Sequence, residues 1–295
     1  MNNKIKKTFS DRCFNLINTL IMLAIAFIMI YPVYYVIIAS ISNAEKLVSF
    51  KGILFRPLAP TLLAYEQAFK NPMLLRSYAN TIFVVVVGTM VSMIFTILGA
   101  YVLSRNNARL VKPAMIMVTI TMFFSGGMIP FYFAVRDLGL DGSLWALIFP
   151  SAINTFNLII MKTAFMAVPS SLEESANIDG AGHFTILLRI ILPVSKSVLA
   201  VIALYYAVAR WNAWFGAMLF LEERESYPLQ LILREILIQN DMSNVSEGVA
   251  SAELGFISVT IKYAIIVIAT VPILCVYPFV QKYFTKGVLI GSVKG

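Results

Sequence analysis

Two acidic side chains on a short polar segment could form charged contacts with a soluble partner. The segment, residues 173–182, lies between two long apolar stretches and carries Glu174 and Asp179. Ser170 and Glu173 have the S-x-x-E spacing of a capping box, which predicts that a short helix starts just after the preceding proline. The carboxylates are therefore expected on this helix and its following turn, where a partner could reach them.

Two glycines are expected to end this helix and to reverse the chain. Gly180 and Gly182 have the backbone freedom that a tight turn requires. A second short helix is predicted over residues 183–190, with a stop at Pro193, because proline lacks the N–H that continues a helix. The segment is thus predicted to form a helix-turn-helix that docks on a partner. A surface helix at the bilayer without a partner is the alternative.

A second set of residues could bind sugar, because polar and indole side chains interrupt the apolar stretches. Asparagine amides can hydrogen-bond to hydroxyl groups, and an indole can stack on the C–H face of a sugar. Ionisable residues within a membrane span normally face the bundle interior or a wet cavity. The alternative is that the asparagines join helices and the tryptophans face lipid or the interface. The candidate substrate-pathway residues are Asn154, Asn157, Arg210, Trp211, Asn212 and Trp214.

Residue patterns for catalysis or metal binding are absent from the sequence. It lacks the G-x-x-x-x-G-K-[ST] loop that binds ATP phosphates. The single histidine, His183, has no second histidine or cysteine near it and is expected at the surface. Cys13 and Cys275 lie in or beside apolar stretches and are expected to be packing residues. We expect no catalytic residue, no metal site and no cofactor bound by this chain, so ATP-driven work would need a separate hydrolysing subunit.

The composition is that of a membrane protein rather than of a soluble domain. The 295 residues are 59% hydrophobic and 13% charged, whereas a soluble domain has about 25% charged residues. The formal net charge of +8 comes from basic residues at the ends of apolar stretches, without a basic stripe and interleaved aromatics. The charge therefore indicates membrane topology, and nucleic acid is not expected as a partner.

Six apolar stretches are each long enough for a transmembrane helix of about 20 residues. The first is too long for the apolar core of a signal peptide, so it is expected to remain as a helix. Loops rich in lysine and arginine alternate so that both termini and residues 169–193 lie in the cytoplasm, whereas the acidic loop 222–255 lies outside. The predicted fold is an all-α membrane protein, a single transmembrane domain over residues 1–295 with a cytoplasmic tail at 282–295. Its predicted spans are 14–41, 80–103, 113–135, 144–168, 194–221 and 256–277.

The order Glu174, Ala176, Asp179-Gly180-Ala181 and then Leu192-Pro193 resembles the EAA loop of ABC-importer permeases. In that family the loop is the coupling element, which sits in a cleft of the cytoplasmic ATPase. The resemblance implies that the polar segment transmits motion from an ATPase to the spans. The implied ATPase-coupling residues are Glu173, Glu174, Ser175, Ala176, Asp179, Gly180, Ala181, Leu192 and Pro193.

The resemblance extends over nearly the whole chain. Trp211-Asn212-x-Trp214, Tyr227-Pro228-Leu229-Gln230 and the tail from Tyr277 to Gly295 are similar to one branch of carbohydrate permeases. This is the LplC and YtcP type, which includes an alginate importer and is similar to the maltose permease MalG. It implies a protein of the bacterial cytoplasmic membrane that forms a heterodimer with a second permease. It also implies two ATPase subunits that bind ATP and Mg, an extracytoplasmic sugar-binding protein, and a tail, residues 286–295, that reaches the ATPases.

Two other classes of protein are weighed against an ABC permease. A secondary sugar transporter needs no ATPase, but it should show paired broken helices or intramembrane acids, and the predicted spans contain almost no Asp or Glu. A membrane-embedded enzyme would need an acid, base or metal cluster, which the sequence lacks. The prediction is an importer subunit that moves oligosaccharides, uronate- or other glycan-derived ones among them, by alternating access across the lipid bilayer.

Overall fold

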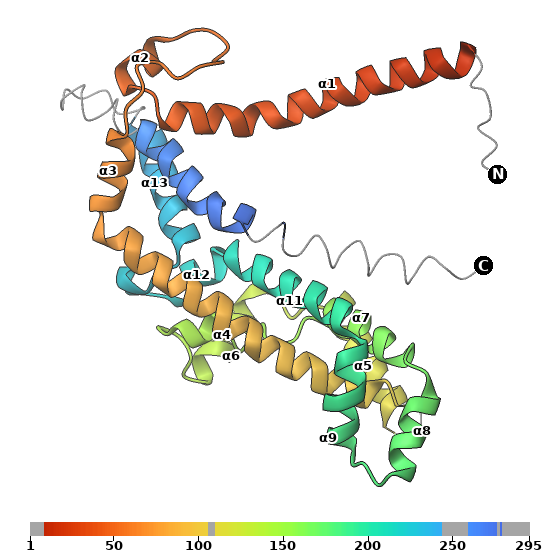
Figure 1. Cartoon of the computed structure of the whole chain (residues 1–295). Helices are drawn as coiled ribbons and strands as arrows, with labels where there is room; N and C mark the ends of the chain where they lie inside the picture. Colours follow the sequence, from red (N-terminus) through yellow and green to blue (C-terminus); the bar gives the residue numbers. More distant parts are fainter. Residues whose placement is uncertain (1–8, 106–109, 244–258, 276–277, 279–295) are drawn as a thin grey trace. The chain divides into compact units, whose positions relative to one another are not determined.

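The computed structural model describes residues 9–105, 110–243, 259–275 and 278, and the regular elements among them are helical (Figure 1). The chain divides into two compact units. The first takes in residues up to Lys70 together with Ile236–Ile268, and the second takes in Asn71–Glu235 together with residues from Ala269 on. The predicted cytoplasmic tail, 282–295, and residues 244–255 of the predicted outer loop 222–255 lie outside the described residues.

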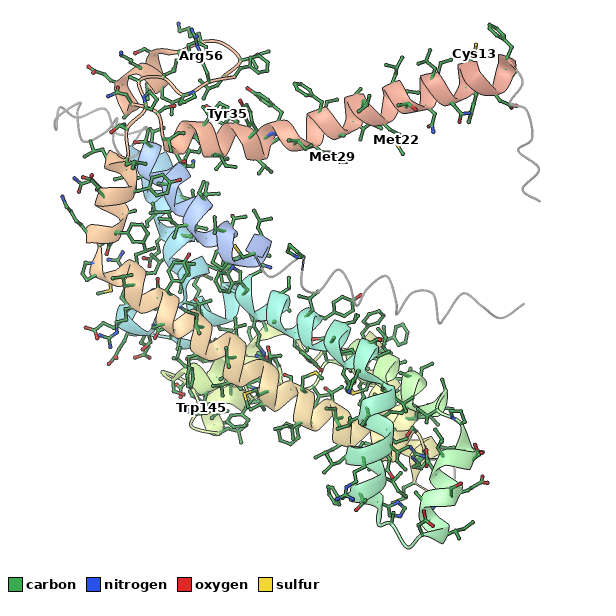
Figure 2. The ribbon with its side chains drawn as sticks, in the orientation of Figure 1. Cys13, Met22, Met29, Tyr35, Arg56 and Trp145 are labelled. Atoms are coloured by element: carbon green, nitrogen blue, oxygen red, sulfur yellow. The ribbon has the colours of Figure 1, made fainter. Side chains whose placement is uncertain are left out.

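The first unit begins with a long helix and two short ones: α1 (Phe9–Ser40), α2 (Ala44–Ser49) and α3 (Leu63–Lys70). Its core gathers at the C-terminal end of α1, where Ile38, Leu47 and Leu54 are buried. Tyr35 of α1 meets Tyr263 edge to face, with ring centroids 5.7 Å apart. The rest of α1 is apolar but exposed, as the side chains drawn along it in Figure 2 show. Such a surface is suited to lipid or to another apolar protein surface.

The second unit is built around α4 (Pro72–Leu103), which packs against α5 (Val111–Phe123), α7 (Thr155–Met166) and α11 (Lys196–Trp211). Helix α4 starts cleanly because the Asn71 side chain accepts the N–H of Met73 and Pro72 occupies the first turn. Small side chains recur along its buried face and allow the neighbouring helices to approach closely. These are Ser77, Thr81, Gly88, Ser92, Thr96 and Ala100.

Three of the predicted spans are each divided into two helical pieces. In the stretch 113–135, α5 ends at Phe123 and α6 (Met128–Asp137) begins after Gly127, whose φ of 88° suits glycine. The stretch 144–168 contains the 3₁₀ turn η1 (Leu144–Leu147) and then α7. The stretch 194–221 contains α11 and then α12 (Phe215–Phe220). Backbone between the pieces is therefore free to line a cavity.

By length and composition, α1 and α4 can each cross a membrane. At about 1.5 Å per residue their 32 residues extend about 48 Å, more than the hydrocarbon core of about 30 Å. Two further apolar pairs are sharply bent: α7 with α8 (Ser170–Ile178) at 69°, and residues 183–194 with α11 at 86°. Helix α5 and the helix Val259–Cys275 are apolar but shorter. Among the described residues the helices are thus those of a membrane protein, while six spans and cytoplasmic termini remain predictions.

Candidate functional site

The polar segment 173–182 forms a helical hairpin whose turn is specified by one glycine. Helix α8 ends at Ile178, and Gly180 follows two residues later at a φ of 79°. The N–H of Ala181 donates to the carbonyl of Ala176 at 2.9 Å, and the N–H of Gly180 donates to the carbonyl of Asn177 at 3.0 Å. These two bonds are the Schellman arrangement, in which a residue in the left-handed region closes the helix. The predicted role of Gly180 as a turn residue agrees with this geometry.

At the start of α8 the predicted capping box is wrong. The helix does begin at Ser170, directly after Pro169, but Pro169 stands at the cap and no side-chain cap bond forms there. The carboxylate of Glu173 pairs instead with the guanidinium of Arg105, just beyond the C-terminal end of α4. That guanidinium also lies over the ring of Tyr101, 4.5 Å from its centroid. The Glu173 carboxylate, which the local pattern predicted to cap α8, therefore binds a charged residue 68 positions away in the sequence.

The tip of the hairpin presents both acidic and apolar side chains to its surroundings. Glu174 and Asp179 are exposed. Beside them Ile178 is 87% exposed and Phe184 is 71% exposed, so neither side chain packs in the core of this unit. Apolar side chains ringed by charge are typical of a protein-docking surface. The hairpin therefore has the chemistry expected of a docking element.

The base of the hairpin is packed firmly onto the second unit. Ala176, Ala181 and Leu192 lie against the cluster that contains Phe165 and Ile186. The small side chains of Ala176 and Ala181 allow the hairpin to approach this cluster closely. Ser175 stays exposed, and its hydroxyl donates to the carbonyl of Ser171 within the helix. Movement imposed on the exposed tip would therefore pass to the helices around the cluster.

After the turn, the helical segment ends at Val194, one residue beyond the predicted stop at Pro193. Helix α9 (His183–Ile186) continues through a π-helical turn, η2 (Leu187–Ile191), into α10 (Leu192–Val194). Pro193 lies inside the last helical turn because Leu192 donates its N–H to the carbonyl of Leu187, five residues back. This wider turn makes room for the proline ring, which would otherwise press on the preceding turn. The chain bends by 86° beyond Val194, where α11 begins.

A cavity of about 690 Å³ opens in the second unit among α4, η1, α7, α11 and α12. Aromatic rings form part of its wall: Phe131, Phe156, Tyr205, Tyr206 and Phe220. Hydroxyl, amide and guanidinium groups complete it, and none of its lining residues is Asp or Glu. A volume of this size accommodates a small-molecule ligand, and mixed aromatic and polar walls are suited to sugars.

Three of the predicted substrate-pathway residues line this cavity. The Oδ1 of Asn154 accepts the N–H of Asn157 at 3.1 Å and caps α7, so part of its bonding capacity is already used. Asn157 itself is buried. The N–H of Asn154 donates to the hydroxyl of Tyr206, which also bonds to Thr96 of α4. Arg210 is the third, and its guanidinium is the cationic group of the lining.

Arg210 is held by neutral oxygens from three parts of the second unit. Its Nη1 donates to the carbonyl of Leu147 at 2.9 Å and to the hydroxyl of Ser151 at 3.3 Å. Its Nη2 donates to the hydroxyl of Ser92 at 2.6 Å. Its Nε is buried without a hydrogen-bond acceptor. Gly88 lies against the same guanidinium and leaves it the space that a side chain would fill.

The other three predicted pathway residues lie away from the cavity lining. Trp211 is buried, and its indole N–H donates to the carbonyl of Ala269 at 3.2 Å. Asn212 is exposed, and its side-chain amide donates to the carbonyl of Val208 in α11. Trp214 stacks under Arg234, whose guanidinium carbon lies 3.5 Å from the ring centroid. Each therefore has a structural partner of its own, and contact with sugar remains a prediction for these residues.

Several cavity residues were not found from the sequence. Tyr205, Tyr206 and Ser151 line the space, yet their types are ordinary in apolar helices and gave no distinguishing signal. Gly88 and Ser92 belong to the repeat of small residues along α4. That repeat is a signal that could have placed α4 against a neighbouring helix, although not against Arg210 in particular.

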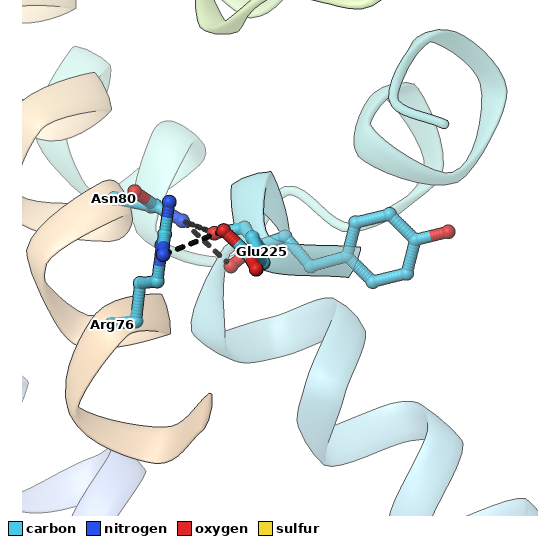
Figure 3. A network of polar contacts seen from close by, with 4 residues as sticks. Arg76, Asn80 and Glu225 are labelled. Carbon is cyan, nitrogen blue, oxygen red and sulfur yellow. Dashed lines mark hydrogen bonds and ion pairs between the residues drawn. The ribbon is translucent and has the colours of Figure 1, made fainter. Parts of the chain in front are cut away.

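At the other end of α4, a polar network fixes the start of the acidic loop (Figure 3). Arg76 pairs with the Glu225 carboxylate at 2.6 Å. The Asn80 amide donates to the backbone carbonyls of Glu225 and Tyr227 at 2.8 and 3.3 Å. The N–H of Leu229 donates to the hydroxyl of Thr81 at 2.8 Å. The loop carrying exposed glutamates is thus held in a defined position on α4.

Comparison with known proteins places the chain among transport permeases, although no family model matches it. It is 46% identical over 290 residues to the polygalacturonan/rhamnogalacturonan transport system permease protein YtcP of Bacillus subtilis (strain 168), covering 97% of this chain and 99% of the relative. It is 44% identical over 292 residues to protein LplC of the same organism, covering 98% and 97%.

Solved structures give the same result. A chain of a bacterial ABC transporter involved in the import of the acidic polysaccharide alginate aligns with a TM-score of 0.87 and 34% identity, covering 95% of this chain and all of that one. A chain from a bacterial alginate ABC transporter in complex with an alginate pentasaccharide-bound periplasmic protein shares the fold at a TM-score of 0.57 and 17% identity, covering 91% and 93%.

Proposed function

From the premise that this chain belongs to the carbohydrate-transport permeases of ABC importers, we propose that it forms part of a membrane pathway for an oligosaccharide. The cavity beside Arg210 is a station on that pathway. An extracytoplasmic binding protein delivers the sugar, a role supported by the periplasmic protein in the alginate complex. The exposed glutamates of the loop anchored by Arg76 and Asn80 offer that protein a charged docking surface.

ATP hydrolysis takes place on other subunits in this proposal. Two ATPase subunits bind ATP and Mg, and a second permease completes the pathway as a heterodimer in the bacterial cytoplasmic membrane. The permease relatives and the docking chemistry of the hairpin support this arrangement. The tail 286–295 is proposed to reach the ATPases, and it lies outside the described residues.

The observation that carries the proposal is the hairpin of α8 and α9, with an acidic and apolar tip on a firmly packed base. When the ATPase pair closes on ATP, the tip moves with it. The packed base and the Arg105–Glu173 pair transmit that movement to α4, α7 and α11. The helices then expose the cavity alternately to the two sides of the membrane, because packed interfaces shift between discrete arrangements.

A charge reversal at the tip tests the coupling. Glu174→Lys is expected to weaken ATPase co-purification and to uncouple ATP hydrolysis from sugar uptake in proteoliposomes, because a carboxylate contact becomes a repulsion. Glu66→Lys, a charge reversal at another exposed glutamate on α3, is the matched control and should leave both measurements unchanged. Full coupling in both Glu174→Lys and Gly180→Pro would count against a role of the hairpin in docking.

The sidedness of the hairpin can be measured directly. In a variant with Cys13 and Cys275 replaced by serine, Ile178→Cys should react with a membrane-impermeant maleimide only after the cells are permeabilised. A cysteine in place of exposed Glu223 should react in intact cells. Reaction of the cysteine at position 178 in intact cells would place the hairpin outside and would remove the proposed coupling to a cytoplasmic ATPase.

A further inference from the structure

In the first unit, the segment that follows α2 folds back along α1 (Figure 2). We call this segment, residues 50–58, the hook. The N–H of Leu54 donates to the hydroxyl of Tyr31 at 3.2 Å. The hydroxyl of Tyr34 donates to the carbonyl of Phe55 at 2.7 Å. Two tyrosine hydroxyls of α1 thus hold the backbone at the tip of the hook.

The base and the tip of the hook lie at different levels along α1. At the base, the N–H of Asn43 donates to the carbonyl of Leu58 at 2.8 Å, close to the end of α1 at Ser40. Tyr31, which binds the tip, lies nine residues before Ser40. At about 1.5 Å per residue this is about 14 Å back along the helix axis. Positions 13–44 carry no charged residue, so the tip reaches back to the apolar part of α1.

The side chains at the tip face alternately the protein core and the surroundings. Leu54 is 2% exposed, whereas Ile53 is 65% exposed and Phe55 is 56% exposed. The ring centroid of Tyr31 lies 6.1 Å from that of Phe55 and 6.4 Å from that of Phe27. A row of rings therefore connects the exposed apolar face of α1 with the hook. The two surfaces form one continuous apolar face.

Basic side chains accompany this apolar face. Lys46, Lys51 and Arg56 are exposed, and within the described residues none of them forms an ion pair. Glu45 is the one acidic residue of the segment 44–58. Apolar side chains beside lysine and arginine are typical of segments that lie in the headgroup region of a membrane, where basic groups meet lipid phosphates.

We propose that the hook is a lipid anchor. Ile53 and Phe55 enter the headgroup region of the bilayer, and Lys51 and Arg56 bind the phosphates of anionic phospholipids. The partner is the bilayer rather than a soluble protein, because the hook turns back along α1 toward its apolar stretch. The tyrosine hydroxyls satisfy an N–H and a carbonyl of the tip that would otherwise be costly to remove from water. The anchor fixes the depth of α1 in the bilayer, whichever saccharide is transported.

Contact with lipid can be measured on the complete importer in nanodiscs, with Cys13 and Cys275 replaced by serine. A nitrobenzoxadiazole fluorophore is attached to Ile53→Cys, and its quenching by nitroxide-labelled phospholipid is compared with its quenching by aqueous iodide. Quenching by the lipid is expected to dominate. The same fluorophore on Gln67→Cys, at an exposed position of α3, controls for the affinity of the dye itself for lipid and should be quenched mainly by iodide.

Two outcomes of this measurement would overturn the lipid anchor. Quenching at position 53 by iodide and not by lipid would place the hook in water. Protection from both quenchers would mean that another protein, such as a second permease or a binding protein, covers the hook. Neither outcome depends on sugar uptake, so a failure of the anchor would leave the proposed coupling through the hairpin unaffected.

The basic residues are tested by comparing nitroxide-labelled phosphatidylglycerol with nitroxide-labelled phosphatidylcholine at equal mole fraction. The fluorophore on Ile53→Cys is expected to be quenched more strongly by the anionic lipid. Adding Lys51→Gln or Arg56→Gln should each lower the relative association constant of the anionic lipid about fivefold, the contribution of one basic residue near an anionic surface. Lys70→Gln, which removes an exposed charge from α3, is the matched control and should keep the preference. Equal quenching by the two lipids before any charge is removed would overturn phosphate binding.

Discussion

Replacing Gly88 by alanine should reveal how tightly Arg210 is packed on α4. The new Cβ would lie 2.7 Å from Nε and 2.9 Å from Cδ and Cζ of Arg210. These contacts are too short, so one of the groups must move. The guanidinium cannot simply rotate away, because the hydroxyl of Ser92 and the carbonyl of Leu147 hold it from other sides. The substitution therefore forces either a shift between helices or the loss of a hydrogen bond.

Gly99 of the same helix provides a matched control for the expected magnitude. A Cβ at Gly99 would lie 3.2 Å from Cδ1 of Leu158, the far end of a flexible side chain. Glycine to alanine within a helix gains about 0.5–1 kcal/mol, which both variants share. Overpacking costs about 1–3 kcal/mol, and a lost hydrogen bond to a charged group costs about 1.5–3 kcal/mol. Gly99→Ala is therefore expected to be neutral or slightly stabilising. Because the shared gain cancels between the two variants, Gly88→Ala is expected to be less stable than Gly99→Ala by about 1–3 kcal/mol.

The assay is thermal unfolding of the purified wild-type protein and the two variants in the same detergent. In domains of 150–250 residues, 1 kcal/mol corresponds to about 2–4 °C in Tm, so Gly88→Ala should melt several degrees below Gly99→Ala. If the two variants melted together, or if Gly88→Ala were the more stable, the close packing of Arg210 against α4 would be refuted. Sugar uptake by Gly88→Ala should fall as well, because the cavity wall moves with the guanidinium.

Three further outcomes can be checked on the same preparations. Gly180→Ala should lower the free energy of unfolding by about 1–2 kcal/mol, because Gly180 has a positive φ. Gly182→Ala should be nearly neutral, because Gly182 has a φ of −74°. Equal Tm values for the two variants would contradict the Schellman turn. Arg105→Gln and Glu173→Gln should each lower ATP-coupled uptake. A double-mutant cycle on the free energy of unfolding should give a coupling energy of about 0.5–3 kcal/mol between the two residues. A coupling energy of zero would exclude this ion pair as a link between the hairpin and α4. Trp211→Phe removes the indole bond to the Ala269 carbonyl and should lower stability by about 0.5–1.5 kcal/mol. The KM of sugar uptake should stay unchanged, and a raised KM would assign this residue to the sugar pathway.

Local sequence patterns were enough to predict the helices around the hairpin. Proline and glycine act on their own backbone, so the start of α8 after Pro169 and its end just before Gly180 could be predicted without tertiary information. The end of the segment near Pro193 could be predicted in the same way. The π-helical turn before it could not, because it depends on the hydrogen bond between Leu192 and Leu187, which no residue type indicates.

The partners of the charged residues could not be predicted from the sequence. Glu173 meets Arg105 across 68 residues, and Arg210 meets Ser92 across 118 residues. Such pairings follow from how helices pack, and a single sequence contains no periodic signal for them. The indole of Trp211 illustrates a different limit, because an aromatic ring with an N–H is equally suited to binding a sugar and to bonding a backbone carbonyl.

The π-helical turn at Leu187–Ile191 also determines which way the hairpin faces. A turn of this kind holds one residue more than the ordinary helix would use. Deleting that surplus residue would rotate the segment before it by about 100° relative to the segment after it. Glu174 and Ile178 would then point in a different direction, although each helix would keep its own conformation. The direction in which the hairpin engages its neighbour is therefore set by a single extra residue in the backbone, outside the hairpin itself.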